Sequence, residues 1–253
     1  MSGHSKWKTI KRKKGIADAA RGQVFTKLAR EIAVAARAGG ADPDMNVRLR
    51  LAVLKAKENN MPVENIERAI QRGAGVGAEG QSTLEEVVYE GYAPGGAAII
   101  LEAVTDNTTR TVAEVRSIFT KAGGNLGERG SVAWNFDQRG VIVVEVSGAK
   151  ADELTLLAID AGAEDFDQDG STLEIRTPSA AFDTVRSALE EAGAVIDRAE
   201  ISMVPKTTIT LDARVASQTL RLLDRLEDMD DVQHVYSNAD FSDEALEEYQ
   251  KAS

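Results

Sequence analysis

The chain has 253 residues, 43% of them hydrophobic, and a formal net charge of −11, so it is long and apolar enough for one to three folded domains. It contains no cysteine, which excludes disulfides and thiolate zinc sites. No apolar run approaches the roughly 18 residues of a membrane helix, and the start lacks the apolar segment of a secretory signal, so we expect a cytoplasmic protein.

The charge is distributed unevenly along the chain. Residues 1–80 hold 16 Lys or Arg and 8 Asp or Glu, a net charge of +8, whereas residues 81–253 hold 14 and 33, a net charge of −19. Six of the cations fall between Lys6 and Lys14, with Trp7 among them. A compact basic block is typical of a segment that contacts nucleic acid, and we expect the acidic remainder to repel phosphate. The alternative is that both parts only keep the surface soluble.

Helices are predicted in the first part of the chain. Apolar residues at three- and four-residue steps predict a helix over 17–38, a second helix that ends before Pro62, and a third from Pro62 to Gly73. We expect a small basic helical domain with an N-terminal arm over residues 1–78. The glycine-rich segment 73–82 follows a helix and not a strand, so we interpret it as a flexible linker and not as a nucleotide-binding loop.

Beyond residue 83, apolar and polar residues alternate, which predicts strands separated by helices. Strands are predicted over 84–92, 97–104, 131–136, 141–146, 163–167, 171–177, 195–203, 206–211 and 232–237. Helices are predicted over 108–122, 150–161, 179–192, 213–228 and 242–250, with Thr108 as an N-cap.

The order of these elements predicts the domain organisation. Residues 139–204 follow the order β-α-β-β-α-β of the ferredoxin-like unit. The flanking segments, 83–137 and 205–238, together supply a second unit of this kind with one extra strand. We therefore expect an α+β multidomain protein: an N-terminal three-helix bundle followed by two ferredoxin-like α+β domains, the third inserted into the second. Residues 239–253 are interpreted as an acidic C-terminal tail.

Residues that support catalysis or metal binding are scarce. The two histidines, His4 and His234, lie far apart in the sequence, and we interpret each as a structural residue. No P-loop or nucleophile motif is present, and acidic runs such as 227–231 are typical of solvated helix ends. We predict no catalytic residue, cofactor, metal or small-molecule substrate, and no membrane contact.

Two polar loops are candidate contact sites. The segment TDNTTRT (105–111) leads into a helix, where free backbone N–H groups beside an arginine can hold an anion; an ordinary capped helix start is the alternative. The glycine-rich AGGNLGERGSVAW (122–134) either approaches a partner closely or forms only a turn. The candidate contact residues of these loops are Asn107, Thr108, Arg110, Asn125 and Arg129.

Several long motifs along the chain resemble those of one known family. They are, in order, MSGHSKWKTIK (1–11), GGADPDMNVRLR (39–50), NNMPVENIERAI (59–70), YEGYAPGG (89–96), TDNTTRTVAEVR (105–116) and GGNLGERGSVAWNF (123–136). They resemble the YebC family, which includes the mitochondrial translational activators of cytochrome oxidase subunit I. The resemblance then weakens but fits in length to about residue 238, and so covers nearly the whole chain.

The resemblance implies three domains and a non-enzymatic regulator of gene expression. Members of this family are described in two ways. Bacterial members are labelled as transcriptional regulators that bind DNA, and others resemble translation factors that help the ribosome through difficult stretches such as consecutive prolines.

The residues themselves favour RNA over DNA. A DNA-reading helix presents its N-terminal residues to base edges, but the third helix carries Glu64 and Glu67 there. A basic arm with an exposed Trp7 suits single-stranded RNA, because a base stacks on the indole while cations meet phosphates. An arm that enters a DNA minor groove is the alternative.

We therefore predict a translation factor whose partner is ribosomal RNA or the ribosome, with a DNA-binding transcriptional regulator as the alternative. The sequence leaves the oligomeric state open, and a monomer is favoured over an oligomer. The candidate nucleic-acid-binding residues are His4, Lys6, Trp7, Lys8, Lys11, Arg12, Lys13, Lys14, Arg21, Lys27, Arg48 and Arg50.

Overall fold

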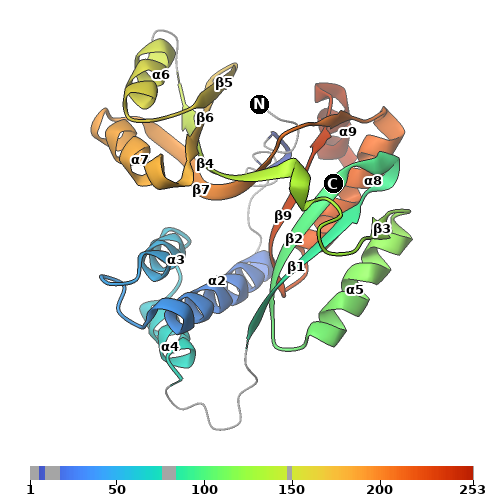
Figure 1. Ribbon diagram of the computed structural model, residues 1–253, viewed down its shortest axis with the longest axis horizontal. Coiled ribbons are helices and arrows are strands. Elements are labelled where there is room, and N and C mark those ends of the chain that lie inside the picture. Colours follow the sequence, from blue (N-terminus) through green and yellow to red (C-terminus); the bar gives the residue numbers. More distant parts are fainter. Residues whose placement is uncertain (1–5, 9–17, 76–83, 147–149, 253) are drawn as a thin grey trace.

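The computed structural model describes residues 6–8, 18–75, 84–146 and 150–252 (Figure 1). Within them, a helical domain lies beside two α+β domains, each built around a four-stranded sheet. This is the mixed α+β architecture that the sequence predicts. Residues 76–82 of the predicted linker lie outside the described residues.

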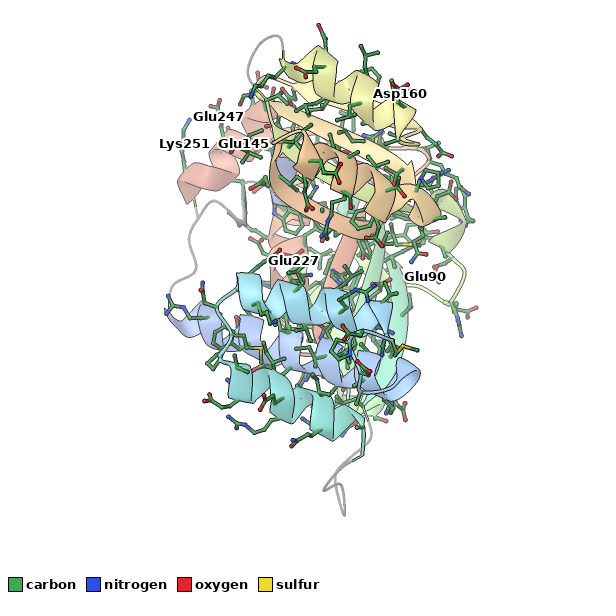
Figure 2. The ribbon with its side chains drawn as sticks, turned by 90° about the vertical axis from the view of Figure 1, so that its left-hand side faces the viewer. Glu90, Glu145, Asp160, Glu227, Glu247 and Lys251 are labelled. Carbon is green, nitrogen blue, oxygen red and sulfur yellow. The ribbon has the colours of Figure 1, made fainter. Side chains whose placement is uncertain are left out.

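The helical domain consists of α2 (Asp18–Gly39), α3 (Val47–Glu58) and α4 (Val63–Gly73). Helix α2 packs against both of the others and lies between them (Figure 2). Its small core contains Ile32 of α2, Leu49 of α3 and Ile66 of α4, all buried. The side chain of Asn46 caps α3 by accepting a hydrogen bond from the backbone N–H of Leu49 at 3.1 Å. The predicted three-helix arrangement is confirmed.

The middle domain is a sheet with helices on one face. Its strands, in the order β3-β1-β2-β9, are β1 (Glu85–Tyr92), β2 (Ala98–Thr105), β3 (Asn125–Leu126) and β9 (Val232–Ser237), and every neighbouring pair is antiparallel. The covering helices are α5 (Thr108–Lys121) and α8 (Ala213–Glu227). Strand β9 comes more than 100 residues after β2, so the two neighbouring strands of this sheet are separated in the sequence by a long insertion.

Alternation along β2 decides what each face of this sheet contacts. Ile99 and Leu101 belong to the core beneath α5 and α8, whereas Ile100 belongs to a second cluster on the opposite face. On that opposite face, Val104 clusters with Val34 of α2. The middle sheet therefore has helices of its own on one side and the helical domain on the other (Figure 1).

The third domain has the ferredoxin-like order that the sequence predicts. Its elements are β4 (Phe136–Glu145), α6 (Lys150–Asp160), β5 (Asp165–Asp169), β6 (Thr172–Pro178), α7 (Phe182–Glu191) and β7 (Val195–Pro205). The sheet order is β5-β6-β4-β7, with antiparallel neighbours. Ile142, Leu173 and Leu189 are among its fully buried core residues.

Two predicted strands differ in the structure. Residues 131–136 are not a strand, since they form a loop and a 3-10 turn (Ala133–Asn135) that leads into the continuous strand β4. Of the predicted strand 206–211, only β8 (Ile209–Thr210) is formed, and it pairs in parallel with β10 (Ala239–Asp240) in a separate two-stranded sheet. In the first of these segments, the backbone N–H groups of Val132 and Ala133 donate to the side chain of Glu90 instead of to a neighbouring strand.

The segment interpreted as an acidic tail is instead part of the middle domain. Helix α9 (Asp243–Ala252) packs on α8, and Phe241, Leu246 and Tyr249 belong to the core beneath α5 and α8. The tail interpretation is therefore wrong for the described residues of this segment. Its acidic side chains lie on the outer face of an amphipathic helix, and the apolar face is buried.

Candidate functional site

Polar side chains of α2 hold the helical domain against the middle domain. The Lys27 ammonium donates to the backbone carbonyl of Glu227, and the Gln23 amide donates to that of Asp228 at 3.4 Å. These carbonyls belong to the C-terminal end of α8, where the helix dipole favours a positive charge. Lys27, a candidate nucleic-acid-binding residue, is therefore already engaged within the protein.

A buried carboxylate, Asp231, lies beside this contact. Its oxygens accept hydrogen bonds from Arg30 of α2 at 2.6 Å, from Arg110 at 3.0 Å, from Thr105 at 3.1 Å and from Thr111 at 2.6 Å. Burial alone would raise the pKa of Asp231, but the Thr111 and Arg110 hydrogen bonds and the Arg30 charge outweigh it and lower the pKa. The side chains around Asp231 thus bind an anion that belongs to the protein itself.

The start of α5 is an ordinary capped helix, which was the alternative left open for segment 105–111. The Asn107 side chain accepts from the backbone N–H of Arg110 at 3.0 Å, so Asn107 is the N-cap and the predicted cap, Thr108, is the first helical residue. Asn107 and Arg110 are exposed, and Thr108 is partly buried. A role for these residues toward an external anion stays a prediction.

The 122–134 loop is fixed by a buried carboxylate on β1. Glu90 accepts hydrogen bonds from the backbone N–H groups of Gly130 at 2.6 Å and of Val132 and Ala133 at 2.8 Å. Burial would raise the pKa of Glu90, but these three backbone donors lower it. Exposed on the same loop are Asn125, which lies in β3, and Arg129.

This loop exposes an indole that the sequence analysis did not single out. Trp134 is 67% exposed, and its Nε1 donates to the carbonyl of Ser131 at 2.9 Å. The ammonium of Lys206 donates to the Trp134 carbonyl at 3.0 Å. A tryptophan in a glycine-rich loop could have indicated this exposed side chain. It was missed because the sequence analysis assigned residues 131–136 to a strand.

The prediction of an exposed Trp7 is wrong. Its side chain is fully buried and belongs to the core of the middle domain, with α8 and α9. The residue lies among lysines in the sequence, but an indole buries a large apolar area when a core offers room for it. Trp7 is therefore an anchor of the N-terminal segment, and it is not available for base stacking.

The lysines on either side of Trp7 have carboxylate partners. The Lys6 ammonium lies 2.7 Å from Asp169 of β5 and 3.0 Å from Asp243 of α9, and these hydrogen bonds raise its pKa. The Lys8 ammonium lies 3.5 Å from Glu200 of β7. Both lysines thus connect the first described residues to the third domain, and a role toward nucleic acid stays a prediction.

The three domains meet at a polar cluster on the face of the middle sheet opposite α8. The Lys8 ammonium lies 4.7 Å from the centre of the Tyr236 ring, which stacks on His234 at 5.9 Å. Burial and the charge of Lys55 lower the pKa of His234 to about 3, so the imidazole is neutral. Burial would raise the pKa of Glu200, but the charges of Lys8 and other cations hold it well below its usual range. A structural role for His234 stays a prediction.

The other predicted cations fall into three groups. Arg48 pairs with Glu86 of β1 and lies 3.8 Å from Glu31, while Arg50 donates to backbone carbonyls near the end of the α2–α3 connection. Arg21 is exposed on α2. Outside the described residues are His4, Lys11, Arg12, Lys13 and Lys14.

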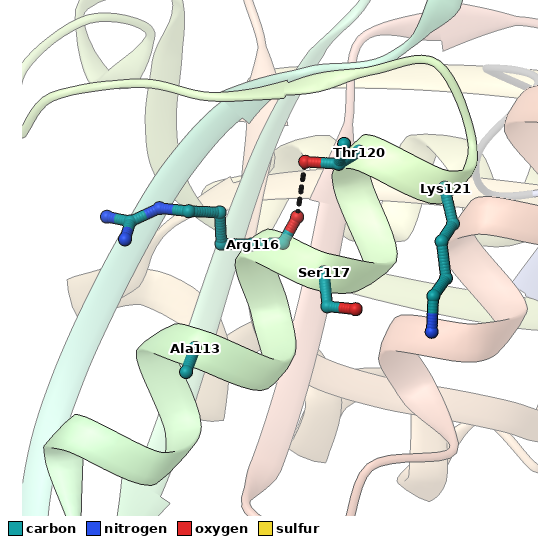
Figure 3. Close-up of a pocket in the computed structure, with 5 residues that line it drawn as sticks. All are labelled: Ala113, Arg116, Ser117, Thr120 and Lys121. Atoms are coloured by element: carbon teal, nitrogen blue, oxygen red, sulfur yellow. Dashed lines mark hydrogen bonds between the residues drawn. The ribbon is translucent and has the colours of Figure 1, made fainter.

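One shallow open depression of about 420 Å³ lies along α5 (Figure 3). It is lined by Ala113, Arg116, Ser117, Thr120 and Lys121. Among the described residues, we find no group of three acidic or histidine side chains arranged to hold a metal ion, and no helix long and apolar enough to cross a membrane.

The whole chain is similar to known proteins of one family. Residues 5–76 match the family described as "TACO1/YebC protein N-terminal domain", and residues 84–239 match "TACO1/YebC second and third domain". A conserved hypothetical protein from Aquifex aeolicus has a crystal structure that superposes with a TM-score of 0.80 at 46% identity, over 89% of this chain and 93% of that one.

Curated bacterial relatives are similarly close. A protein of Dehalococcoides mccartyi (strain CBDB1) is 54% identical over 249 residues, 98% of each chain. A protein of Pelotomaculum thermopropionicum is 54% identical over 245 residues, 96% of this chain and 100% of the relative. Both are named probable transcriptional regulatory proteins. The matches span the helical domain and both α+β domains, and the chain therefore belongs to the TACO1/YebC family.

Proposed function

We propose that this protein is a non-enzymatic regulator of gene expression that contacts nucleic acid, with ribosomal RNA on the ribosome as its target. The observation that carries the proposal is the separation of charge, with +8 in residues 1–80 and −19 in residues 81–253. A polyanion is attracted to the helical end and repelled by most of the remainder, so the protein would approach it in one orientation.

Exposed cations on the helical domain support this orientation. Arg50 and Lys57 lie two turns apart on α3, and Arg68 and Arg72 lie one turn apart on α4. Within the part of the chain that the structure describes, none of the four forms an ion pair with an acidic side chain. Their charges remain available to phosphate, unlike those of Lys27 and Arg48.

Two features favour RNA over a DNA groove. Glu64 and Glu67 are exposed at the start of α4, where carboxylates would meet phosphate unfavourably if that helix entered a groove. The exposed Trp134, beside Lys206, offers a stacking surface of the kind that unpaired bases use. Trp134 thus takes the role that the sequence suggested for Trp7.

A DNA-binding transcriptional regulator is the second candidate, and the names of the bacterial relatives favour it. The two are separated by ultraviolet crosslinking in living cells, followed by sequencing of the recovered nucleic acid. Recovery of ribosomal RNA at defined positions supports the proposal. Recovery of discrete genomic sites without ribosomal RNA would replace it with the transcriptional regulator.

A further inference from the structure

Helix α8 carries a row of arginines on its exposed face. Arg214, Gln218, Arg221 and Arg225 follow one another at steps of four, three and four residues, so they line one side of the helix, and all are exposed. The opposite side of α8 is buried in the core of the middle domain. From Arg214 to Arg225 the row extends about 16 Å along the helix axis.

The arginines of this row are free of acidic partners. Within the described residues, no carboxylate forms an ion pair with Arg214, Arg221 or Arg225. The acids on the same helix have other partners: Asp212 caps its start by accepting from the Val215 N–H at 3.0 Å, and Asp224 accepts from the Tyr249 hydroxyl. Residues 81–253 carry a net charge of −19, so three cations on one side of a helix without an acidic partner are unexpected there.

The stability of α8 does not account for the row. Arg214 is the second residue of the helix, where the helix dipole disfavours a positive charge. Arg221 and Arg225 are one turn apart, and like charges at that spacing repel each other. Only Arg225, in the last turn, benefits from the dipole. A row that costs helix stability but stays exposed is best explained by a ligand outside the protein.

The neighbouring helix adds to the positive charge. Helix α5 packs beside α8 in the same layer, and it exposes Arg116 and Lys121 at the shallow depression described above (Figure 3). Neither of these cations has an ion pair with a described residue. The layer formed by α5 and α8 covers one face of the middle sheet, and α2 packs on the opposite face and meets α8 at the C-terminal end of α8 (Figure 1).

We propose that this face, defined by Arg214, Gln218, Arg221 and Arg225 and here named the α8 row, binds the phosphate backbone of a nucleic acid. Arginine is the residue suited to phosphate, because its planar guanidinium donates two parallel hydrogen bonds. A duplex carries about one charge per 1.7 Å of its axis, so a row of this length meets several phosphates. The inference rests on the proposed function and adds a second site at which the protein contacts nucleic acid. This site lies on the middle domain, although the net negative charge of residues 81–253 would by itself predict that this domain repels phosphate.

The test is a triple variant of the full chain, Arg214→Gln, Arg221→Gln and Arg225→Gln, which removes three charges and keeps good helix formers. Its control removes three cations elsewhere, the exposed Lys150→Gln and Lys251→Gln and the partly buried Arg186→Gln, with the same change in net charge. Binding of purified ribosomal RNA and of a short duplex DNA is measured over a range of salt concentrations. Thermal unfolding of both variants reports whether they are folded.

We expect the α8-row variant to keep or raise the melting temperature and to flatten the log–log salt dependence by about 0.7–0.9 per lost phosphate contact. The control variant should change the slope of the salt dependence by less than the loss of one phosphate contact would. The inference is wrong if the slope of the log–log salt dependence is unchanged in the α8-row variant, or if it changes equally in both variants. In either case the proposed function still stands if the wild-type chain binds nucleic acid. If the wild-type chain binds neither nucleic acid, both are wrong.

Discussion

Arg30 of α2 and Asp231, which precedes β9, are separated by 201 positions in the sequence, and their side chains meet at 2.6 Å across the contact between the helical and middle domains. Asp231 is almost fully buried, and Arg110, Thr105 and Thr111 complete its set of partners. The pair thus joins a helix of the first domain to the last strand of the middle sheet.

Removing the carboxylate charge should loosen this contact. Asp231→Asn leaves Arg30 without its anionic partner at a largely buried site, and we expect a loss of about 3 kcal/mol in the free energy of unfolding. Because the pKa of Asp231 is lowered in the folded protein, its contribution is complete above the ordinary pKa of aspartate and is lost as the pH falls below it. Urea unfolding of the variant at neutral pH measures the loss.

The exposed pair Arg48–Glu86 is a matched control, since it joins the same two domains with side chains that are 44% and 49% exposed. Double-mutant cycles should give a coupling of about 0–1 kcal/mol for Arg48–Glu86 and a larger one for Arg30–Asp231. Equal coupling in the two pairs would show that burial of Asp231 adds nothing.

Trp7 should behave as a core residue. Trp7→Ala is expected to lower the free energy of unfolding by about 3–5 kcal/mol, because it leaves a cavity in the middle domain, and Trp7→Phe should lower it less. Since the chain has two tryptophans, Trp134→Phe isolates the Trp7 fluorescence. That emission should resist quenching by iodide, whereas the emission of Trp7→Phe, from Trp134, should be quenched readily. If iodide readily quenches both emissions, the Trp7 side chain is exposed to solvent and not buried.

The basic block before α2 should act on binding without acting on the fold. Changing Lys11, Arg12, Lys13 and Lys14 to Ala should weaken nucleic-acid binding and flatten the log–log salt dependence by roughly 0.7–0.9 for each phosphate contact that is lost. The melting temperature should stay that of the wild type. A salt dependence equal to the wild type's would show that the block only keeps the protein soluble.

His234 should make stability depend on pH. Its pKa is about 3 in the folded protein and about 6.5 when unfolded, so below pH 6.5 the unfolded state binds a proton that the folded state does not. Wild-type stability should therefore fall as the pH drops, by about 1–2 kcal/mol between pH 6.5 and pH 5. His234→Gln should lack this fall, although its stability at neutral pH is lower. Parallel curves for the two proteins would contradict a neutral imidazole at position 234.

Local pattern was enough to predict much of the fold. The period-two pattern beyond residue 83 predicted the strand over 97–104, which the structure forms as β2 with Ile99 and Leu101 on one face and Ile100 on the other. The β-α-β-β-α-β order predicted the ferredoxin-like third domain, because short connections allow few topologies. The N-terminal helices followed from three- and four-residue spacing. Each of these depends on residues that are close together in the sequence.

What the sequence could not assign was the partner of each charged or aromatic residue. It counted the cations of residues 1–80, but only the tertiary structure decided that Lys27 caps α8 and that Lys6 pairs with Asp169, whereas the α8 row stays unpaired. It found Trp7 among lysines, but a core formed by α8 and α9, more than 200 residues away, decided that the indole is buried. Such contacts depend on which distant segments the fold brings together, and no local pattern of residues contains that information.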